Sequence, residues 1–143
     1  MTAPRHLHVA LDELGTYEIA GDKDHPRIIE YLRTVVLPAS VDLHDEVNWC
    51  SAFVSWCMLT AGGTSTRNAA ARSWLKWGRG TTNPQPGDVA VFWRGSPDSW
   101  KGHVGFYIGK VGGYVVVLGG NQGNKVSVRY YKASQLLGCR RAA

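Results

Sequence analysis

The segment Asn48-Trp49-Cys50-Ser51-Ala52-Phe53-Val54-Ser55-Trp56-Cys57 decides the fold, because it predicts a helix that is apolar on most of its sides. Asn48 is a good N-cap, since its side chain accepts hydrogen bonds from the free amides of a first helical turn. Gly62-Gly63 supply the stop, so the helix is expected over about residues 49–61. A helix with so few polar positions belongs at the centre of a fold. Its first turn carries the thiol of Cys50.

Helices and strands are predicted to occupy separate halves of the chain. Apolar spacing and flanking breakers predict further helices over about residues 7–14, 24–37 and 69–77. After the breaker-rich run 82–87, four segments are typical of strands: 88–94, 103–110, 114–118 and 125–131. Gly112-Gly113 predicts a tight hairpin, and strands joined by short turns are antiparallel. Helices followed by an antiparallel sheet make an α+β fold.

Composition sets the broad class of the protein. The chain of 143 residues, 44% of them hydrophobic, is expected to form one domain over residues 1–143. No apolar run is long enough to span a bilayer, and residues 1–6 lack the apolar core of a secretory signal. Three cysteines cannot all pair within one molecule, so at least one free thiol is expected. The formal net charge of +5 favours an anionic partner, either nucleic acid, an anionic membrane or an acidic wall polymer.

Cys50 and His103 are the residues that predict chemistry. A cysteine in the first turn of a buried helix faces the positive end of the helix dipole and unpaired amides, and both lower the pKa of the thiol. His103 starts a predicted strand between two glycines, so little side-chain bulk separates its ring from the helix end. A thiol and an imidazole in contact make a nucleophile. The second ring nitrogen needs an orienting partner, for which Asn121 is the first candidate and Gln122 the second.

Each of these residues also has a purely structural explanation. Free cysteines are most often small buried hydrophobes, and Asn121 lies among glycines, where a turn residue with positive φ is equally expected. Cys57, two turns into the helix, is assigned to packing, and Cys139 in the basic tail to no role. The remaining histidines are expected to be solvated: His6, His8, His25 and His44. No spacing fits a zinc site or a calcium loop, so no metal or other cofactor is predicted.

Five short strings, in order along the chain, resemble the CHAP and NlpC-type cysteine peptidases, and more narrowly a small CHAP-like group of phage lysins and bacterial proteins. Each string alone is modest, but five in order are specific. Segments 18–21 and 26–31 fit the same group, so the resemblance covers nearly the whole chain. The strings are Trp49-Cys50-Ser51-Ala52-Phe53-Val54, Ala71-Arg72-Ser73-Trp74-Leu75, Pro86-Gly87-Asp88-Val89-Ala90-Val91-Phe92, Gly102-His103-Val104-Gly105-Phe106-Tyr107 and Leu118-Gly119-Gly120-Asn121-Gln122.

The resemblance implies a papain-like α+β fold. In such a fold, N-terminal helices pack on an antiparallel sheet of four to six strands, and the nucleophile starts a buried helix. The resemblance makes Cys50 the nucleophile and His103 the general base and acid, with a polar third residue. Many CHAP enzymes carry a glutamate and an asparagine close together after the histidine strand. Here Gly119 stands at the glutamate position, so only the asparagine carries over, and the expected catalytic set is Cys50, His103 and Asn121.

The resemblance also implies peptidoglycan as the substrate, cut at the amide between muramic acid and L-alanine or at an amide of the stem peptide and its cross-links. The expected substrate-binding residues are Trp49, Trp93, Trp100 and Gln122. We expect a monomeric phage endolysin, made in the host cytoplasm without a signal peptide and released to the wall through a membrane pore. Its positive charge favours anionic wall polymers or lipid as additional partners.

Two other functions fit the same sequence. A bacterial amidase effector has the same fold and chemistry, and its gene neighbourhood distinguishes it from a lysin. A non-catalytic cell-wall-binding module on a decayed peptidase fold is the second alternative, and the retained Cys50 and His103 argue against it. Binding of nucleic acid is not expected, since the basic residues are scattered along the chain.

Overall fold

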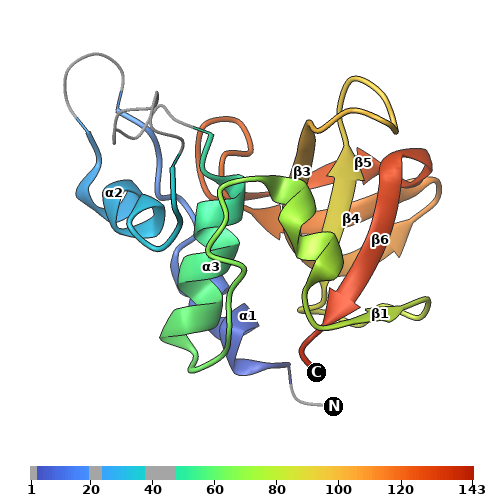
Figure 1. Cartoon of the computed structure of the whole chain (residues 1–143), viewed down its shortest axis with the longest axis horizontal. Coiled ribbons are helices and arrows are strands. Elements are labelled where there is room, and N and C mark those ends of the chain that lie inside the picture. The colour runs from blue at the N-terminus through green and yellow to red at the C-terminus, as the bar shows by residue number, and fades with distance from the viewer. Residues whose placement is uncertain (1–2, 20–23, 38–47) are drawn as a thin grey trace.

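Helices come first along the chain and a sheet follows, as Figure 1 shows for the computed structural model, which describes residues 3–19, 24–37 and 48–143. The helices are α1 (Arg5–Asp12), α2 (Pro26–Leu32) and α3 (Cys50–Thr60), followed by the 3-10 helix η1 (Ala71–Lys76). The strands are β1 (Arg79–Thr81), β2 (Val89–Trp93), β3 (Gly102–Val111), β4 (Tyr114–Gly119), β5 (Ser127–Lys132) and β6 (Leu136–Arg141), with the 3-10 helix η2 (Ala133–Gln135) before β6. The predicted α+β class is confirmed.

The strands of the described chain form one antiparallel sheet in the order β1-β6-β2-β3-β4-β5. The four predicted strands correspond to β2, β3, β4 and β5, and Gly112, with φ of 57°, forms the turn between β3 and β4. The sequence patterns do not predict β1, which is only three residues long, or β6, which is basic and contains a glycine. The last strand therefore returns to the middle of the sheet, between β1 and β2.

Cys139 on β6 is a core residue, contrary to the expectation of an incidental residue in a basic tail. It is 5% exposed and packs with Ala90, Phe92 and Val117. Because side chains alternate across a strand, this cluster covers the sheet face opposite the one on which Val91 packs with the helices. The sheet is thus packed on both faces where the strands are longest.

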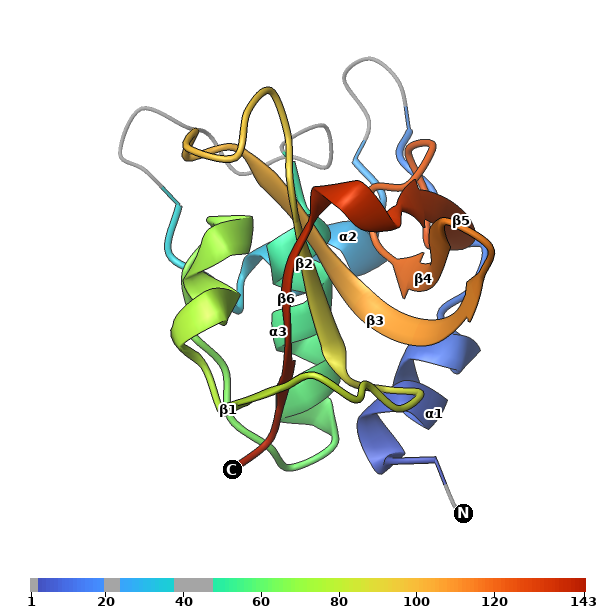
Figure 2. The same ribbon diagram turned by 90° about the vertical axis from the view of Figure 1, so that its right-hand side faces the viewer.

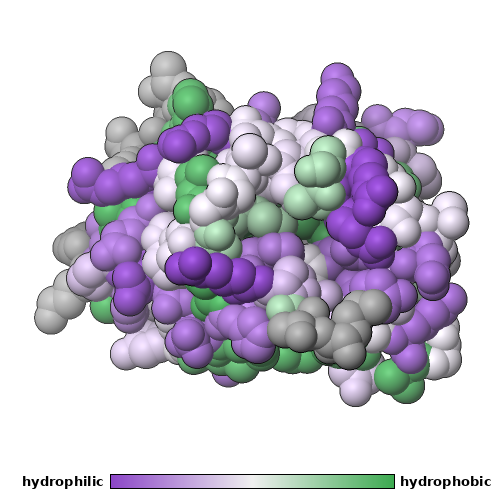
Figure 3. Space-filling model, turned by 90° about the horizontal axis from the view of Figure 1, so that it is seen from below, coloured by the Kyte–Doolittle hydropathy of each residue, from purple (hydrophilic) through white to green (hydrophobic). Residues whose placement is uncertain are grey.

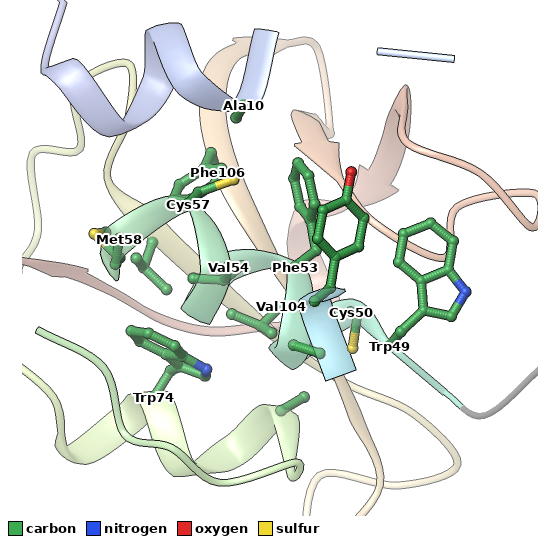
Figure 4. Packing of buried hydrophobic residues seen from close by; sticks show 14 of the residues in the cluster. Ala10, Trp49, Cys50, Phe53, Val54, Cys57, Met58, Trp74, Val104 and Phe106 are labelled. Atoms are coloured by element: carbon green, nitrogen blue, oxygen red, sulfur yellow. The ribbon is translucent and has the colours of Figure 1, made fainter. Parts of the chain in front are cut away.

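Helix α3 is the buried centre of the helical face, as predicted. Trp49, Phe53, Val54 and Cys57 are all 0% exposed, and Figure 4 shows them gathered around the helix beside β3. The Tyr31 ring of α2 lies 5.2 Å from the Phe53 ring, measured between centroids. The thiol of Cys57 therefore serves packing, as its position along the helix indicated.

The start of α3 lies one residue later than expected. The helix begins at Cys50, so Trp49 holds the N-cap position and makes no side-chain cap. The Asn48 side chain still reaches the first turn, where its Oδ1 accepts from the backbone N–H of Cys50 at 3.4 Å. Near residues 69–77 the expected helix is present as the 3-10 helix η1, which is shorter.

Two histidines expected to be solvated have structural roles instead. His6 on α1 donates through Nε2 to the carbonyl of Gly87 at 2.6 Å, and burial lowers its pKa. His25 occupies the N-cap position of α2, where its Nδ1 accepts from the backbone N–H of Arg27 at 3.2 Å. His8 is exposed, as expected. His44 lies outside the described residues.

Hydrophilic residues predominate on the one face of the molecule that Figure 3 shows. Both termini lie at the same end in Figures 1 and 2, and hydrophilic residues cover most of the face seen from that end in Figure 3, with hydrophobic ones in separate patches. Across residues 3–19, 24–37 and 48–143, the structure contains no helix long and apolar enough to cross a bilayer.

Ser51→Ala is expected to destabilise the fold around the start of α3. The buried Ser51 hydroxyl donates to the carbonyl of Asn68 at 2.7 Å and accepts from Nε1 of Trp74 at 2.9 Å. Its loss leaves the buried indole N–H unpaired, so the free energy of unfolding measured in urea should fall by about 1–3 kcal/mol. The exposed Ser134→Ala is the control and should change it by less than about 0.5 kcal/mol. Equal losses in the two variants would contradict this role.

Candidate active site

The thiol of Cys50 lies where the first turn of α3 meets the start of β3. It is 1% exposed, and the backbone amides of Cys50, Ser51 and Val104 favour its ionised form and so lower the pKa of the thiol. The first two amides belong to a helix N-terminus, where N–H groups have no partner within the helix, and the third belongs to the strand residue that follows His103. The structure therefore brings the sulfur beside the strand that carries the histidine, as the sequence predicted.

The imidazole of His103 is fixed in one tautomer by Gln122. The buried Gln122 amide nitrogen donates to the carbonyls of Val117 at 3.1 Å and Ser127 at 2.7 Å, so its Oε1 turns toward the ring. Because a carbonyl oxygen only accepts, His103 Nε2 must carry the proton in the 2.8 Å hydrogen bond to this oxygen. Tyr131 stacks on the ring with centroids 4.7 Å apart. His103 thus keeps an unprotonated Nδ1, the nitrogen able to accept a proton.

Gly119 explains why a glutamine reaches this position. A Cβ at Gly119 would lie 2.5 Å from Oε1 of Gln122, and one at Gly105 would lie 3.5 Å from the same oxygen. The Gln122 amide therefore fills the space where a side chain at position 119 would begin.

Asn121 does not contact His103, although the sequence placed it there first. It adopts φ of 58°, which agrees with its alternative interpretation as a turn residue. Its Nδ2 donates to Oδ1 of Asn48 at 3.0 Å, the same oxygen that accepts from the backbone N–H of Cys50. The orienting contact expected of Asn121 is made by Gln122, and Asn121 instead lies at the start of α3.

Arg94 is the partner of the second nitrogen of the histidine. It follows β2 directly, and its Nη2 donates to Nδ1 of His103 at 3.3 Å. The guanidinium also hydrogen-bonds the side chain of Tyr131. The sequence analysis missed Arg94, since only the pairing of β2 with β3, with Phe92 opposite His103, brings the two side chains together.

Burial outweighs the helix dipole in this arrangement. Burial raises the pKa of the Cys50 thiol above its usual value, although three backbone amides and Arg94 act in the opposite direction. The pKa of His103 is lowered to about 4, chiefly by burial. The positive charge of Arg94 also lowers this pKa, whereas the hydrogen bond to Gln122 raises it by less than burial lowers it. The expectation of a thiolate formed by backbone dipoles is therefore corrected for the unliganded protein, in which both groups are neutral at pH 7.

The predicted substrate-binding residues have different surroundings. Trp49 is fully buried and donates from Nε1 to Glu18 at 2.8 Å, so it is a core residue and not part of a groove. Gln122 is 2% exposed and faces His103. Trp93 is half-buried on β2. Of the four, Trp100, 78% exposed, is the one that lines a groove.

This groove has a volume of about 960 Å³ and is lined by neighbours in sequence of the two candidate catalytic residues, which are themselves buried. Asn48, next to the start of α3, and Gly102, next to His103, line the same groove as Arg94. Arg67 and Lys101 add positive charge to it, and the run 69–71 adds an apolar wall of alanines. A thiol, a fixed imidazole and convergent hydrogen-bond donors beside such a groove are able to carry out acyl transfer from a bound amide.

Comparison with known proteins shows the family and the fold of the chain. A family model described as the CHAP domain matches residues 43–121, more than half of the chain. The crystal structure of the wild-type endolysin LysIME-EF1 is similar, with a TM-score of 0.58 and 15% sequence identity, over 99% of this chain and 65% of that one. The present chain thus spans only part of the length of that endolysin. The predicted papain-like fold is confirmed, and no curated protein matches the sequence.

The buried His103 is expected to make stability depend on pH. Its pKa is about 4 in the folded chain, against 6.5 for a histidine in water, the value expected in the unfolded chain. Between these two values only the unfolded chain takes up the proton. The free energy of unfolding should therefore fall as pH decreases from 6.5 to 4, by up to roughly 3 kcal/mol from this residue.

Chemical denaturation at several pH values measures this effect. His103→Asn should flatten the slope, with a remainder from His6, whose pKa burial also lowers. His8→Asn, at an exposed position, should leave the slope unchanged. An unaltered slope in His103→Asn would show that the ring is not held neutral by its surroundings.

Proposed function

Because the chain belongs to the CHAP-domain family, we propose that it hydrolyses an amide bond of peptidoglycan with Cys50 as nucleophile and His103 as general base and acid. The observation that carries the proposal is the Gln122 contact, which leaves Nδ1 of His103 as the basic nitrogen. The same fold places Cys50 against the backbone of β3. The tautomer of His103, the burial of both side chains and the position of Cys50 at the start of α3 all fit a cysteine hydrolase.

The reaction starts from the neutral pair. His103 Nδ1 takes the Cys50 proton as the sulfur attacks the carbonyl carbon of the scissile amide. The tetrahedral intermediate collapses when His103 returns this proton to the leaving amine, and a thioester to Cys50 remains. Water then attacks the thioester with the same imidazole as base, and the carboxylic acid product leaves. Gln122 keeps the imidazole oriented through both halves of the reaction.

The hydrogen bonds of Asn48 Oδ1 support a position for the oxyanion of the intermediate. Two donors converge on this oxygen, the backbone N–H of Cys50 at 3.4 Å and Nδ2 of Asn121 at 3.0 Å. A substrate carbonyl bound in place of the Asn48 side chain meets the same two donors as it gains negative charge. Asn121 is therefore the second oxyanion donor in this proposal, a catalytic residue with a different task from orienting His103.

An endolysin role is supported by the likeness to an endolysin of the same fold, which supplies the fold but not the activity. The net charge of +5 suits adhesion to anionic wall polymers. A bacterial amidase effector shares all of this chemistry and is the alternative enzyme. A binding module without activity is disfavoured, because it has no use for a buried histidine that Gln122 holds in one tautomer.

Cys50→Ala should abolish the loss of turbidity of purified cell walls, while Cys57→Ala, a change at the packing cysteine, should lose stability but keep the reaction. Removal of the nucleophile eliminates the thioester path, so the rate should fall at least about a thousandfold. Circular dichroism verifies that both variants are folded. Mass spectrometry of the released fragments identifies the scissile bond from the new amino termini. Lysis by Cys50→Ala at the wild-type rate would overturn the proposed function.

Asn121→Gly tests the second oxyanion donor without straining the backbone, since glycine accepts the φ of 58° at this position. The variant should lose about a hundredfold or more in kcat on a soluble muropeptide substrate, with little change in KM. Asn121→Asp keeps the shape but loses the donor, so it should fail similarly. Near-normal kcat in both variants would remove Asn121 from the catalytic set.

A further inference from the structure

The groove carries positive charge that the described part of the chain does not neutralise. Arg67, Arg94 and Lys101 line it, and the ion pairs within the described residues involve other cations, Arg27 and Arg141. Arg72 beside the groove is different, because each nitrogen of its guanidinium donates to a backbone carbonyl, of residues 101, 97 and 96. Arg67, Arg94 and Lys101 take part in none of these ion pairs, so they are available to a ligand. Arg72 instead holds the loop that contains residues 96, 97 and 101.

Arg94 is hydrogen-bonded to Nδ1 of His103, the nitrogen that must accept a proton in the proposed reaction. While its Nη2 donates to Nδ1 of His103, the lone pair of that nitrogen is not available for the proton of Cys50. The contact is long, at 3.3 Å, and joins an exposed guanidinium to a neutral ring. A carboxylate is a much better partner for a guanidinium, since it accepts two parallel charge-assisted hydrogen bonds.

We propose that Arg94 binds a carboxylate of the peptidoglycan stem peptide, and that this contact draws the guanidinium away from Nδ1 of His103 and frees the catalytic base. The inference rests on the proposed function and adds the substrate group that the site recognises. Arg94 thereby couples recognition to catalysis, because a ligand without a carboxylate leaves the base covered. Trp100 and the alanine wall flank the groove in which such a peptide lies.

A peptide carboxylate is favoured over the phosphate of a wall polymer by the position of Arg94. The guanidinium is in contact with His103, so its ligand must lie within a residue or so of the scissile amide. Stem peptides carry free carboxylates next to their amide bonds, whereas a phosphate polymer has no amide to place there. Arg67 and Lys101 line the same groove, but the described contacts include no hydrogen bond from either of them to His103. A ligand of Arg67 or Lys101 therefore need not lie close to the scissile amide.

The test uses cell walls freed of phosphate polymers by acid extraction, with one half further treated with carbodiimide and ammonia to convert carboxylates into carboxamides. The wild-type protein should clear the native walls at least about tenfold faster than the amidated walls. Arg94→Gln should clear native walls more slowly than wild type, yet amidated walls no more slowly, since its base is no longer covered. Arg94→Lys keeps the positive charge but lacks the paired N–H donors of a guanidinium. Compared with Arg94→Gln, it should restore part of the preference for native walls over amidated walls.

Lys110→Gln is the matched control, because it removes one positive charge from an exposed residue at the far end of β3. It should keep the wild-type preference for native walls. The inference is overturned if Arg94→Gln loses the same factor on both kinds of wall, if Lys110→Gln loses the preference equally, or if the wild type clears both walls at one rate. Failure of the wild type to clear native walls at all would instead overturn the proposed function.

Discussion

The hydrogen bond between Gln122 and His103 is the constraint on which the site depends. Two backbone carbonyls, of Val117 and Ser127, hold the glutamine amide in one orientation, and its oxygen then determines which nitrogen of the imidazole carries the proton. A histidine without this contact would be free to present either nitrogen to the thiol. The strands β4 and β5 therefore act on the reaction through a single buried amide, and Gly119 provides the space that it needs.

Burial shapes the resting state of the two reacting groups. The helix start at Cys50 supplies backbone amides that favour a thiolate, but exclusion of water favours the neutral thiol more strongly. The same exclusion keeps His103 neutral, and Arg94 adds to that effect. In the proposed reaction the neutral pair becomes reactive when a substrate rearranges the polar groups around it, in particular the Asn48 oxygen and the Arg94 guanidinium.

The fold keeps this site rigid by packing the sheet on both faces. Helix α3 covers one face, and the cluster around Phe92 and Cys139 covers the other, with Tyr131 stacked on both Phe92 and His103. Strand β6, which returns from the end of the chain, is needed for that second cluster. The position of the imidazole is thus determined by residues from several strands, and Cys50, the proposed nucleophile, comes from the helix on the opposite face.

The sequence by itself predicted the α+β class, a buried helix that starts near Cys50, four of the strands and the two candidate reacting side chains, because apolar periodicity, caps and short motifs are local properties. Only the tertiary structure decided which polar residue orients His103, that Arg94 covers Nδ1, that Trp49 is core, and that β6 joins the middle of the sheet. Asn121 and Gln122 are neighbours in the chain, and only the paths of β4 and β5 determine which amide faces the ring. Contacts between residues far apart in sequence, and the loss of water around them, are properties of the assembled fold.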